Sequence, residues 1–212
     1  FDGEVVYISA GDELFAFTPD FRPAGSWRNA YLKHCHEIAV YQRMLYLTST
    51  GCDSILGFDL DSQEFRWAMQ VETDQFRFKG TVYDPRKQDG PLMLNKLHVN
   101  SVHCTQGGMY ITGMRTGGML LFNGKHVQMA GQLPAGSHNA RPFRDGVLFN
   151  DTEANALRYA GRGEGQEDRA FRVPRYDPAQ LQNRDMDTSG IARQGFARGL
   201  CTLSETAVAG GS

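Results

Sequence analysis

The sequence predicts an all-β protein, a β-propeller of four-stranded antiparallel sheets called blades. Short alternating runs of Val, Ile, Leu, Tyr and Phe are separated by Gly, Asp and Asn turns, and segments with a helical period are hard to find. Glycine is abundant, at 24 of 212 residues, as the turns of a strand-rich chain require. The third observation is a repeat, because groups of such strands recur along the chain with similar internal spacing.

Each repeat opens with a polar residue, which is followed by a short apolar strand, a turn and a second apolar strand. The four opening residues are His36, His98, His138 and Arg198. The middle of the second strand follows ten residues later in three repeats, and twelve residues later after His98. We interpret the four opening residues as one repeat position.

Further strands follow in the same order. Third strands with an aromatic residue near their end are expected at 53–60, 117–124 and 154–161, and fourth strands at 64–71, 126–133 and 169–175. Four antiparallel strands recurring at about 40 residues are typical of a propeller blade. One blade cannot bury both of its faces alone, so stacked blades form the core.

The predicted organisation is a single propeller domain over 1–212, or a fragment of one. It has a partial blade at 1–30, blades at 36–71, 98–134 and 138–175, the start of a further blade at 198–212, and insertions at 72–96 and 161–197. About four to five blades are visible, so two alternatives stay open. The chain is a piece of a larger ring, which we favour, or its two ends complete one shared blade.

The opening residues suggest a site. In a propeller the first strand of each blade lines a central channel, so equivalent residues converge at one mouth. We predict that His36, His98 and His138 bind a divalent metal ion and leave a position open for water or substrate. Substrate-binding residues are predicted at Asn100, Asn139, Arg141 and Arg198, because guanidinium groups pair well with carboxylates and phosphates. The alternative is structural: polar groups at strand starts can simply bond to the neighbouring blade.

Composition excludes several functional classes. Lys and Arg number 22 against 24 Asp and Glu, with no basic run, so we expect no nucleic-acid partner. Apolar stretches are only strand-length, so no membrane span is expected. Neither a GxSxG motif nor a dinucleotide fingerprint is present, which disfavours a nucleophilic hydrolase and a nucleotide cofactor. The four cysteines form no CxxC pair, which favours reduced thiols in a cytoplasmic protein.

Several motifs carry a resemblance. The segment "YLTSTGCDSILGFDLDSQEFRW" resembles the non-WD propellers of the quinoprotein-like and gluconolactonase-like superfamilies. More narrowly, "KLHVNSV", "SHNARPFRDGVLFND" and "FARGLC" resemble an uncharacterised bacterial propeller family, some of whose members are joined to helical repeats. The resemblance covers roughly 36–60 and 95–212, and the long insertion at 161–197 departs from it. It implies the propeller fold and no particular reaction.

These observations predict a soluble propeller whose channel binds a small polar or anionic ligand. The predicted chemistry is hydrolase, lyase or isomerase activity that depends on one divalent metal ion. The alternative is a non-catalytic propeller that serves as a protein-interaction scaffold. The sequence leaves open whether the chain is an enzyme, and whether a protein partner or further blades complete it.

Overall fold

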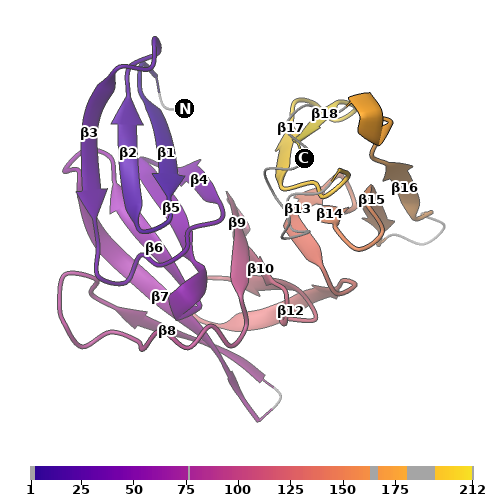
Figure 1. Ribbon diagram of the computed structural model, residues 1–212. Coiled ribbons are helices and arrows are strands. Elements are labelled where there is room, and N and C mark those ends of the chain that lie inside the picture. The colour runs from indigo at the N-terminus through magenta and orange to yellow at the C-terminus, as the bar shows by residue number, and fades with distance from the viewer. Residues whose placement is uncertain (1–2, 76, 163–166, 181–193, 212) are drawn as a thin grey trace. The chain divides into compact units, whose positions relative to one another are not determined.

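The computed structural model describes residues 3–75, 77–162, 167–180 and 194–211 (Figure 1). These residues form β-strands and two short 3-10 helices, η1 (Thr50–Cys52) and η2 (Pro178–Gln180). No helix in this part of the chain has the length and apolar character needed to cross a membrane. The chain divides into two compact units, 1–133 and 134–212, and each is described by itself.

The first unit contains three antiparallel sheets. The first sheet holds β1 (Val6–Ala10), β2 (Glu13–Phe17) and β3 (Pro23–Arg28), in that order. The second holds β4 (Ile38–Tyr41), β5 (Met44–Ser49), β6 (Ser54–Asp59), β7 (Glu64–Asp74) and β8 (Arg77–Tyr83). The third holds β9 (Val99–Thr105), β10 (Gly108–Gly113), β11 (Gly118–Phe122) and β12 (Val127–Gln132). In each sheet, strands that follow one another in the chain are neighbours, as in a propeller blade.

Side-chain alternation decides which face of each strand points inward. In β2, Leu14 and Ala16 are buried while Glu13, Phe15 and Phe17 are half-buried on the other face. The same period of two appears at the start of β5 and in β10. A one-residue shift in pairing would turn these apolar side chains outward, so the pattern fixes the pairing.

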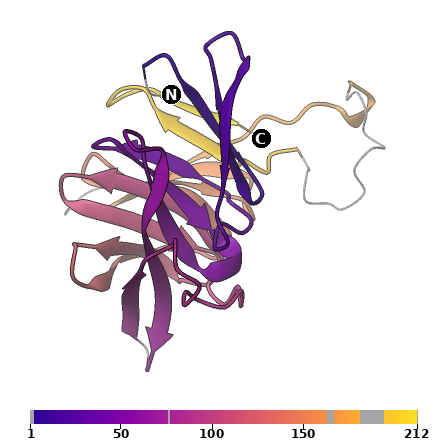
Figure 2. The same ribbon diagram turned by 90° about the vertical axis from the view of Figure 1, so that its left-hand side faces the viewer.

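The second sheet has one strand more than a blade needs. The sequence placed an insertion at 72–96, and the first part of that segment forms the end of β7 and the whole of β8. The two strands pair from Ala68 opposite Tyr83 to Asp74 opposite Arg77. The far end of this hairpin extends past the neighbouring strands (Figures 1 and 2).

The core of the first unit lies between successive sheets. One cluster joins the first and second sheets through residues that include Leu14, Leu45 and Phe58. A second cluster joins the second and third sheets through residues that include Ile55, Met69 and Ile111. Each sheet therefore buries a face against the next, which is the stacking that a propeller requires.

The second unit contains a four-stranded sheet and a hairpin. The sheet holds β13 (Ser137–Phe143), β14 (Gly146–Asp151), β15 (Ala156–Gly161) and β16 (Arg169–Arg172), and the hairpin holds β17 (Gly199–Thr202) and β18 (Val208–Gly211). Every residue of β14 is buried, whereas every residue of β16 is exposed. The sheet is therefore packed at its centre and open at its outer strand.

The four thiols differ in burial, and we expect them to differ in reactivity. Burial raises the pKa of Cys35 and Cys52, and it raises the pKa of Cys104 to about 12, whereas Cys201 is exposed. The thiolate is the reactive form, and a raised pKa leaves less thiolate at pH 8. Ellman's reagent at pH 8 should therefore modify Cys201 first, as peptide mass mapping would show. Modification of Cys104 at the rate of Cys201 would contradict this burial, and all four should react in denaturant.

Candidate functional site

Strand pairing allows the opening residues of the repeats to be aligned from one sheet to the next. The residue opposite the middle of each second strand is Ala39 in the second sheet, His103 in the third and Arg141 in the sheet of the second unit. Three residues before these stand His36, Asn100 and His138. Counted back from these paired residues, Asn100 stands where His36 and His138 stand, and His98 lies two residues earlier.

The left-handed backbone supports the same alignment. Five residues before Ala39, His103 and Arg141, the chain has His34, His98 and Gly136. Their φ values are 56°, 55° and 76°. The carbonyl groups of His98 and Gly136 also accept equivalent hydrogen bonds, from the N–H groups of Met114 at 3.2 Å and Thr152 at 3.3 Å. A two-residue shift keeps side chains on the same face of a strand, so the apolar pattern could not reveal the difference.

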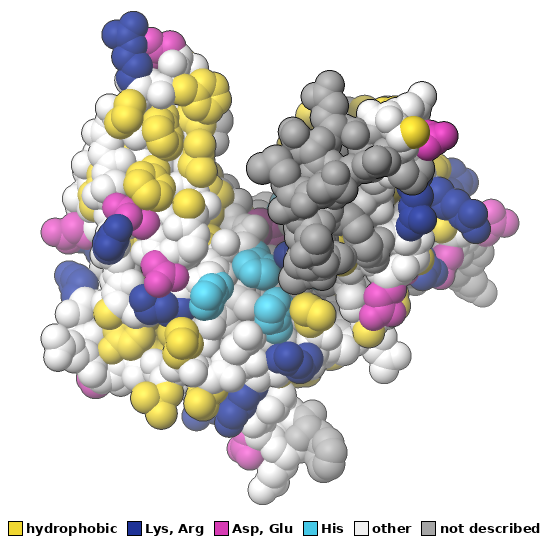
Figure 3. Space-filling model, in the orientation of Figure 1, with side chains coloured by type: hydrophobic (Ala, Val, Ile, Leu, Met, Phe, Trp, Pro, Cys, Tyr) yellow, Lys and Arg dark blue, Asp and Glu magenta, His cyan; other side chains and the backbone are white. Residues whose placement is uncertain are grey.

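His36 and His98 nevertheless lie together. They come from the entry segments of the neighbouring strands β4 and β9, and their ring centroids are 5.3 Å apart at an interplanar angle of 80°. His36 is exposed and His98 half-buried, and Figure 3 shows histidine side chains gathered on one face. Asn95 Oδ1 lies 3.0 Å from His98 Nδ1 and orients this ring. Glu37 Oε2 accepts the Val102 N–H at 2.9 Å, which ties β4 to β9 beside the pair.

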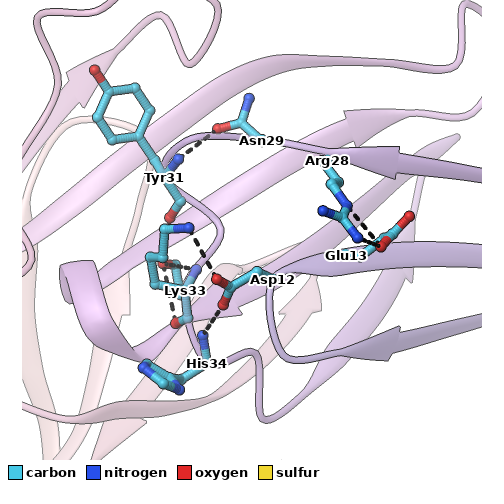
Figure 4. Close-up of polar contacts among 8 residues, drawn as sticks. Asp12, Glu13, Arg28, Asn29, Tyr31, Lys33 and His34 are labelled. Carbon is cyan, nitrogen blue, oxygen red and sulfur yellow. Dashed lines mark hydrogen bonds and ion pairs between the residues drawn. The ribbon is translucent and has the colours of Figure 1, made fainter.

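The entry to the second sheet is held by the turn between β1 and β2 (Figure 4). The Asp12 carboxylate accepts hydrogen bonds from Lys33 Nζ at 3.0 Å and from the His34 N–H at 3.2 Å. The bond from Lys33, helped by the backbone bond, lowers the pKa of Asp12. This carboxylate fixes the left-handed residue from which the chain turns toward His36.

Asp53 fixes the segment at 96–99, which leads into the third sheet. Its buried carboxylate accepts backbone N–H groups of Lys96 at 2.5 Å, Leu97 at 3.1 Å and Val99 at 3.4 Å. Asp53 itself is left-handed, with a φ of 48°. It thereby connects the turn between β5 and β6 to both sides of His98, and sequence reasoning missed it. The signal was present, because an Asp directly after a Gly-containing turn often adopts this conformation.

Asn100 is a predicted ligand-binding residue whose polar atoms are unusual. It is 1% exposed, and neither Oδ1 nor Nδ2 has a hydrogen-bond partner within the described residues. The same is true of the hydroxyl groups of Ser101 and Thr112, which lie opposite one another on β9 and β10. Buried polar groups are nearly always hydrogen-bonded, so this cluster is suited to a polar partner beyond the described residues.

In the second unit, His138 and Asn139 lie at the start of β13. His138 is 3% exposed, and its Nδ1 lies 2.9 Å from the Gly136 carbonyl. Asn139 is left-handed at a β-bulge, and its Oδ1 accepts the Asn150 amide at 3.0 Å. The same Asn150 amide reaches the Gly199 carbonyl at 3.2 Å and links the sheet to the hairpin.

The predicted arginines differ in exposure. Arg141 is buried, and its Nε donates to the Asn139 carbonyl at 3.3 Å. Arg198 is exposed and stacks on Phe196 at 4.6 Å, and partial burial lowers its pKa. His138 contacts the same ring with centroids 6.1 Å apart, so Phe196 joins two predicted site residues. Sequence reasoning assigned Phe196 no role.

The structure therefore groups the predicted residues within each unit: His36, His98 and Asn100 in the first, and His138, Asn139, Arg141 and Arg198 in the second. Convergence of the two groups on one axis stays a prediction. Within the described residues, no group of three or more His, Cys, Asp or Glu side chains could hold a metal ion.

No protein-family model matches this chain, and no curated protein sequence does. A solved structure of streptogramin B lyase resembles it with a TM-score of 0.52 at 10% identity over 82% of this chain. A catalytically inactive virginiamycin B lyase from Staphylococcus aureus with quinupristin gives a TM-score of 0.45 at 10% identity over 76% of this chain.

These comparisons concern the fold. The chain spans about half the length of the two lyase structures, 53% and 49%. Together with the successive four-stranded antiparallel sheets, the first similarity confirms the predicted all-β propeller fold. At a sequence identity of 10%, the similarity does not indicate that this chain catalyses the same reaction.

Proposed function

We propose that this chain is a ligand-binding β-propeller in which the entry segments of the first strands hold a small polar or anionic ligand. The observation that carries this proposal is the His36–His98 pair, two imidazole rings 5.3 Å apart from neighbouring sheets. Imidazole nitrogens donate or accept hydrogen bonds according to their protonation, and imidazolium attracts anions. Two such rings side by side suit a carboxylate or phosphate group.

The surroundings of the pair support a preorganised site. Asn95 orients His98, and Asp53 holds the backbone on both sides of His98 through Lys96, Leu97 and Val99. Binding groups that are fixed before the ligand arrives lose little entropy on binding. Asn100, two residues further along β9, carries the buried amide that lacks partners in the described chain. A polar ligand or its bound water would satisfy that amide.

In the second unit by itself, Arg198 offers a planar guanidinium on the Phe196 ring, which His138 also contacts. A second form of the proposal includes a divalent metal ion. It requires that His36, His98 and His138 surround one ion. Within the described residues no group of three His, Cys, Asp or Glu side chains could hold one, and the hydrogen-bonding form requires none.

An interaction scaffold is the second candidate. Leu92, Met93 and Leu94 are 74%, 59% and 53% exposed, and they lie on the segment that leads to His98. Three consecutive exposed apolar residues are uncommon on a soluble surface and favour a contact with another molecule.

Replacing His98 with glycine should weaken ligand binding and keep the fold. Glycine tolerates the left-handed backbone at this position, as Gly136 does at the equivalent position. Calorimetric titration with citrate and with inorganic phosphate should show binding by the parent protein. His98→Gly and His36→Gln should each weaken it about tenfold or more, as expected for loss of a hydrogen bond to a charged group.

His126→Gln is the matched control, because His126 is exposed on the turn before β12, away from the pair. Its affinity should equal that of the parent protein. Parent protein that binds neither anion, or site variants that bind like His126→Gln, would refute the proposal. Loss of folding in His98→Gly would instead assign that ring a structural role.

A further inference from the structure

A second concave site lies in the first unit, between the outer strands β8 and β12. It is a groove of about 500 Å³, lined by 77–80 of β8 and by 125–129, which form the start of β12 and the turn before it. In the third sheet two strands separate β12 from β9, so these strands are roughly 14 Å apart at about 4.8 Å per strand. The groove is therefore separate from His98, which directly precedes β9.

The floor of the groove is apolar. Phe78, two residues before Gly80 and on the same face of β8, packs against the core cluster that joins the second and third sheets. A Cβ atom at Gly80 would lie 2.9 Å from Val127 Cγ2, so β8 and β12 are in close contact at this point. Met129 on β12 is 40% exposed and extends the apolar surface. An apolar side chain of a ligand would lose contact with water here.

Three permanent cations border this floor, and no described residue that lines the groove is acidic. Arg77 and Lys79 alternate with the floor residues along β8, and Lys125 lies in the turn before β12. All three are exposed, and none forms an ion pair with another described residue. His126, also exposed, adds a positive charge when it is protonated. The whole chain has a net charge of −2, so the groove is a local concentration of positive charge.

Two carboxylates stand on β7, across the strand pair from the cations of β8. Asp74 is opposite Arg77, and Glu72 is opposite Lys79. The Glu72 carboxylate accepts the Thr81 hydroxyl at 2.9 Å, and neither carboxylate forms an ion pair with the cation opposite it. The positive charges on this wall of the groove are therefore available to a ligand.

We propose that this groove binds an extended acidic peptide segment with an apolar side chain between its carboxylates. Lys and Arg side chains only donate hydrogen bonds and stay positively charged, so the ligand that complements them is an anion. Carboxylates of the segment lie beside the cations of β8 and of the turn before β12, and its apolar side chain lies on the floor. This binding uses side chains and needs no strand pairing with the edge of β8.

The number of charges favours a peptide over a nucleic acid. Proteins that bind DNA tightly make about six to ten phosphate contacts. The groove supplies three permanent cations, and the net charge of −2 on the chain disfavours the approach of a long polyanion. An apolar floor also suits a peptide, because it is matched by an aliphatic side chain.

Fluorescence anisotropy of a dye-labelled, capped Glu-Glu-Leu-Glu-Glu peptide measures this binding. The parent protein should bind the peptide saturably, and a peptide with Gln in place of each Glu should bind at least about tenfold more weakly. Raising the salt from about 50 mM to about 500 mM should weaken binding at least about fivefold, because exposed charges are screened.

Lys125→Glu should weaken binding about fivefold, because it replaces an attraction with a repulsion. Lys87→Glu is the matched control, since Lys87 is exposed in the same unit and does not line the groove. If Lys125→Glu lowers the melting temperature, Lys125→Gln should still weaken binding about twofold. The proposal is overturned if the parent protein does not bind the acidic peptide, if the Gln peptide binds equally well, or if the Lys125 variants bind like Lys87→Glu. Tighter binding of a single-stranded oligonucleotide of equal charge would also overturn it, in favour of a nucleic-acid site.

Discussion

Replacing Asp53 with alanine is expected to lower the free energy of unfolding of the first unit by about 3 kcal/mol. The carboxylate accepts three backbone N–H groups, of which those of Leu97 and Val99 belong to buried residues. Its removal leaves buried donors unpaired and places alanine at a φ of 48°, which L-residues other than Asn and Asp adopt at a cost. Urea denaturation followed by tryptophan fluorescence measures the effect, because Trp27 and Trp67 both lie in the first unit.

Two variants make this expectation specific. Asp53→Asn keeps the tolerance for a left-handed backbone and one acceptor oxygen, so it should cost less than Asp53→Ala. Asp61→Ala removes an exposed carboxylate that pairs with Arg43 at 2.8 Å, and it should leave the urea midpoint nearly unchanged. Equal midpoints for Asp53→Ala and Asp61→Ala would mean that the three backbone bonds contribute nothing to stability.

Phe58→Ala should destabilise the first unit by about 4 kcal/mol. The Phe58 side chain is fully buried between Trp27 and Phe65, with ring centroids 5.0 and 5.1 Å away. Truncation removes apolar burial and leaves a cavity that rigid strands on both sides cannot close. The same urea experiment measures the loss, and the emission of Trp27 should shift because its neighbour is gone.

Leu92→Ala is the control for this prediction, since Leu92 is apolar, in the same unit and 74% exposed. It should unfold at the urea concentration of the parent protein. A small effect of Phe58→Ala would show that the first and second sheets do not share a core.

Much of the fold was predictable because strands leave a clear signal. Alternation of Leu14 and Ala16 with outward residues, and tight turns between apolar runs, identify strands and their order without further information. The extra strand β8 was harder. Its sequence, Arg77–Tyr83, contains a glycine and two basic residues, and only pairing with β7 makes it a strand.

The candidate site was predictable in part. The sequence indicated polar residues at strand starts, and the structure groups His36 with His98 and His138 with Phe196 and Arg198. It could not show that Asn100 is the equivalent of His138, because a shift of two residues leaves strand faces unchanged. Long-range bonds such as those from Asp53 to the chain at 96–99 leave no local pattern at all.

The fifth strand of the second sheet also changes which strand forms the open edge of that sheet. Without β8, the long strand β7 would present its unpaired N–H and C=O groups to any other extended chain, and such edges seed aggregates. With β8 present, the exposed edge carries Arg77 and Lys79, and its middle is Gly80, which approaches Val127 on β12. Charged side chains make an edge strand a poor template for another chain, so we expect this hairpin to hinder edge-to-edge association.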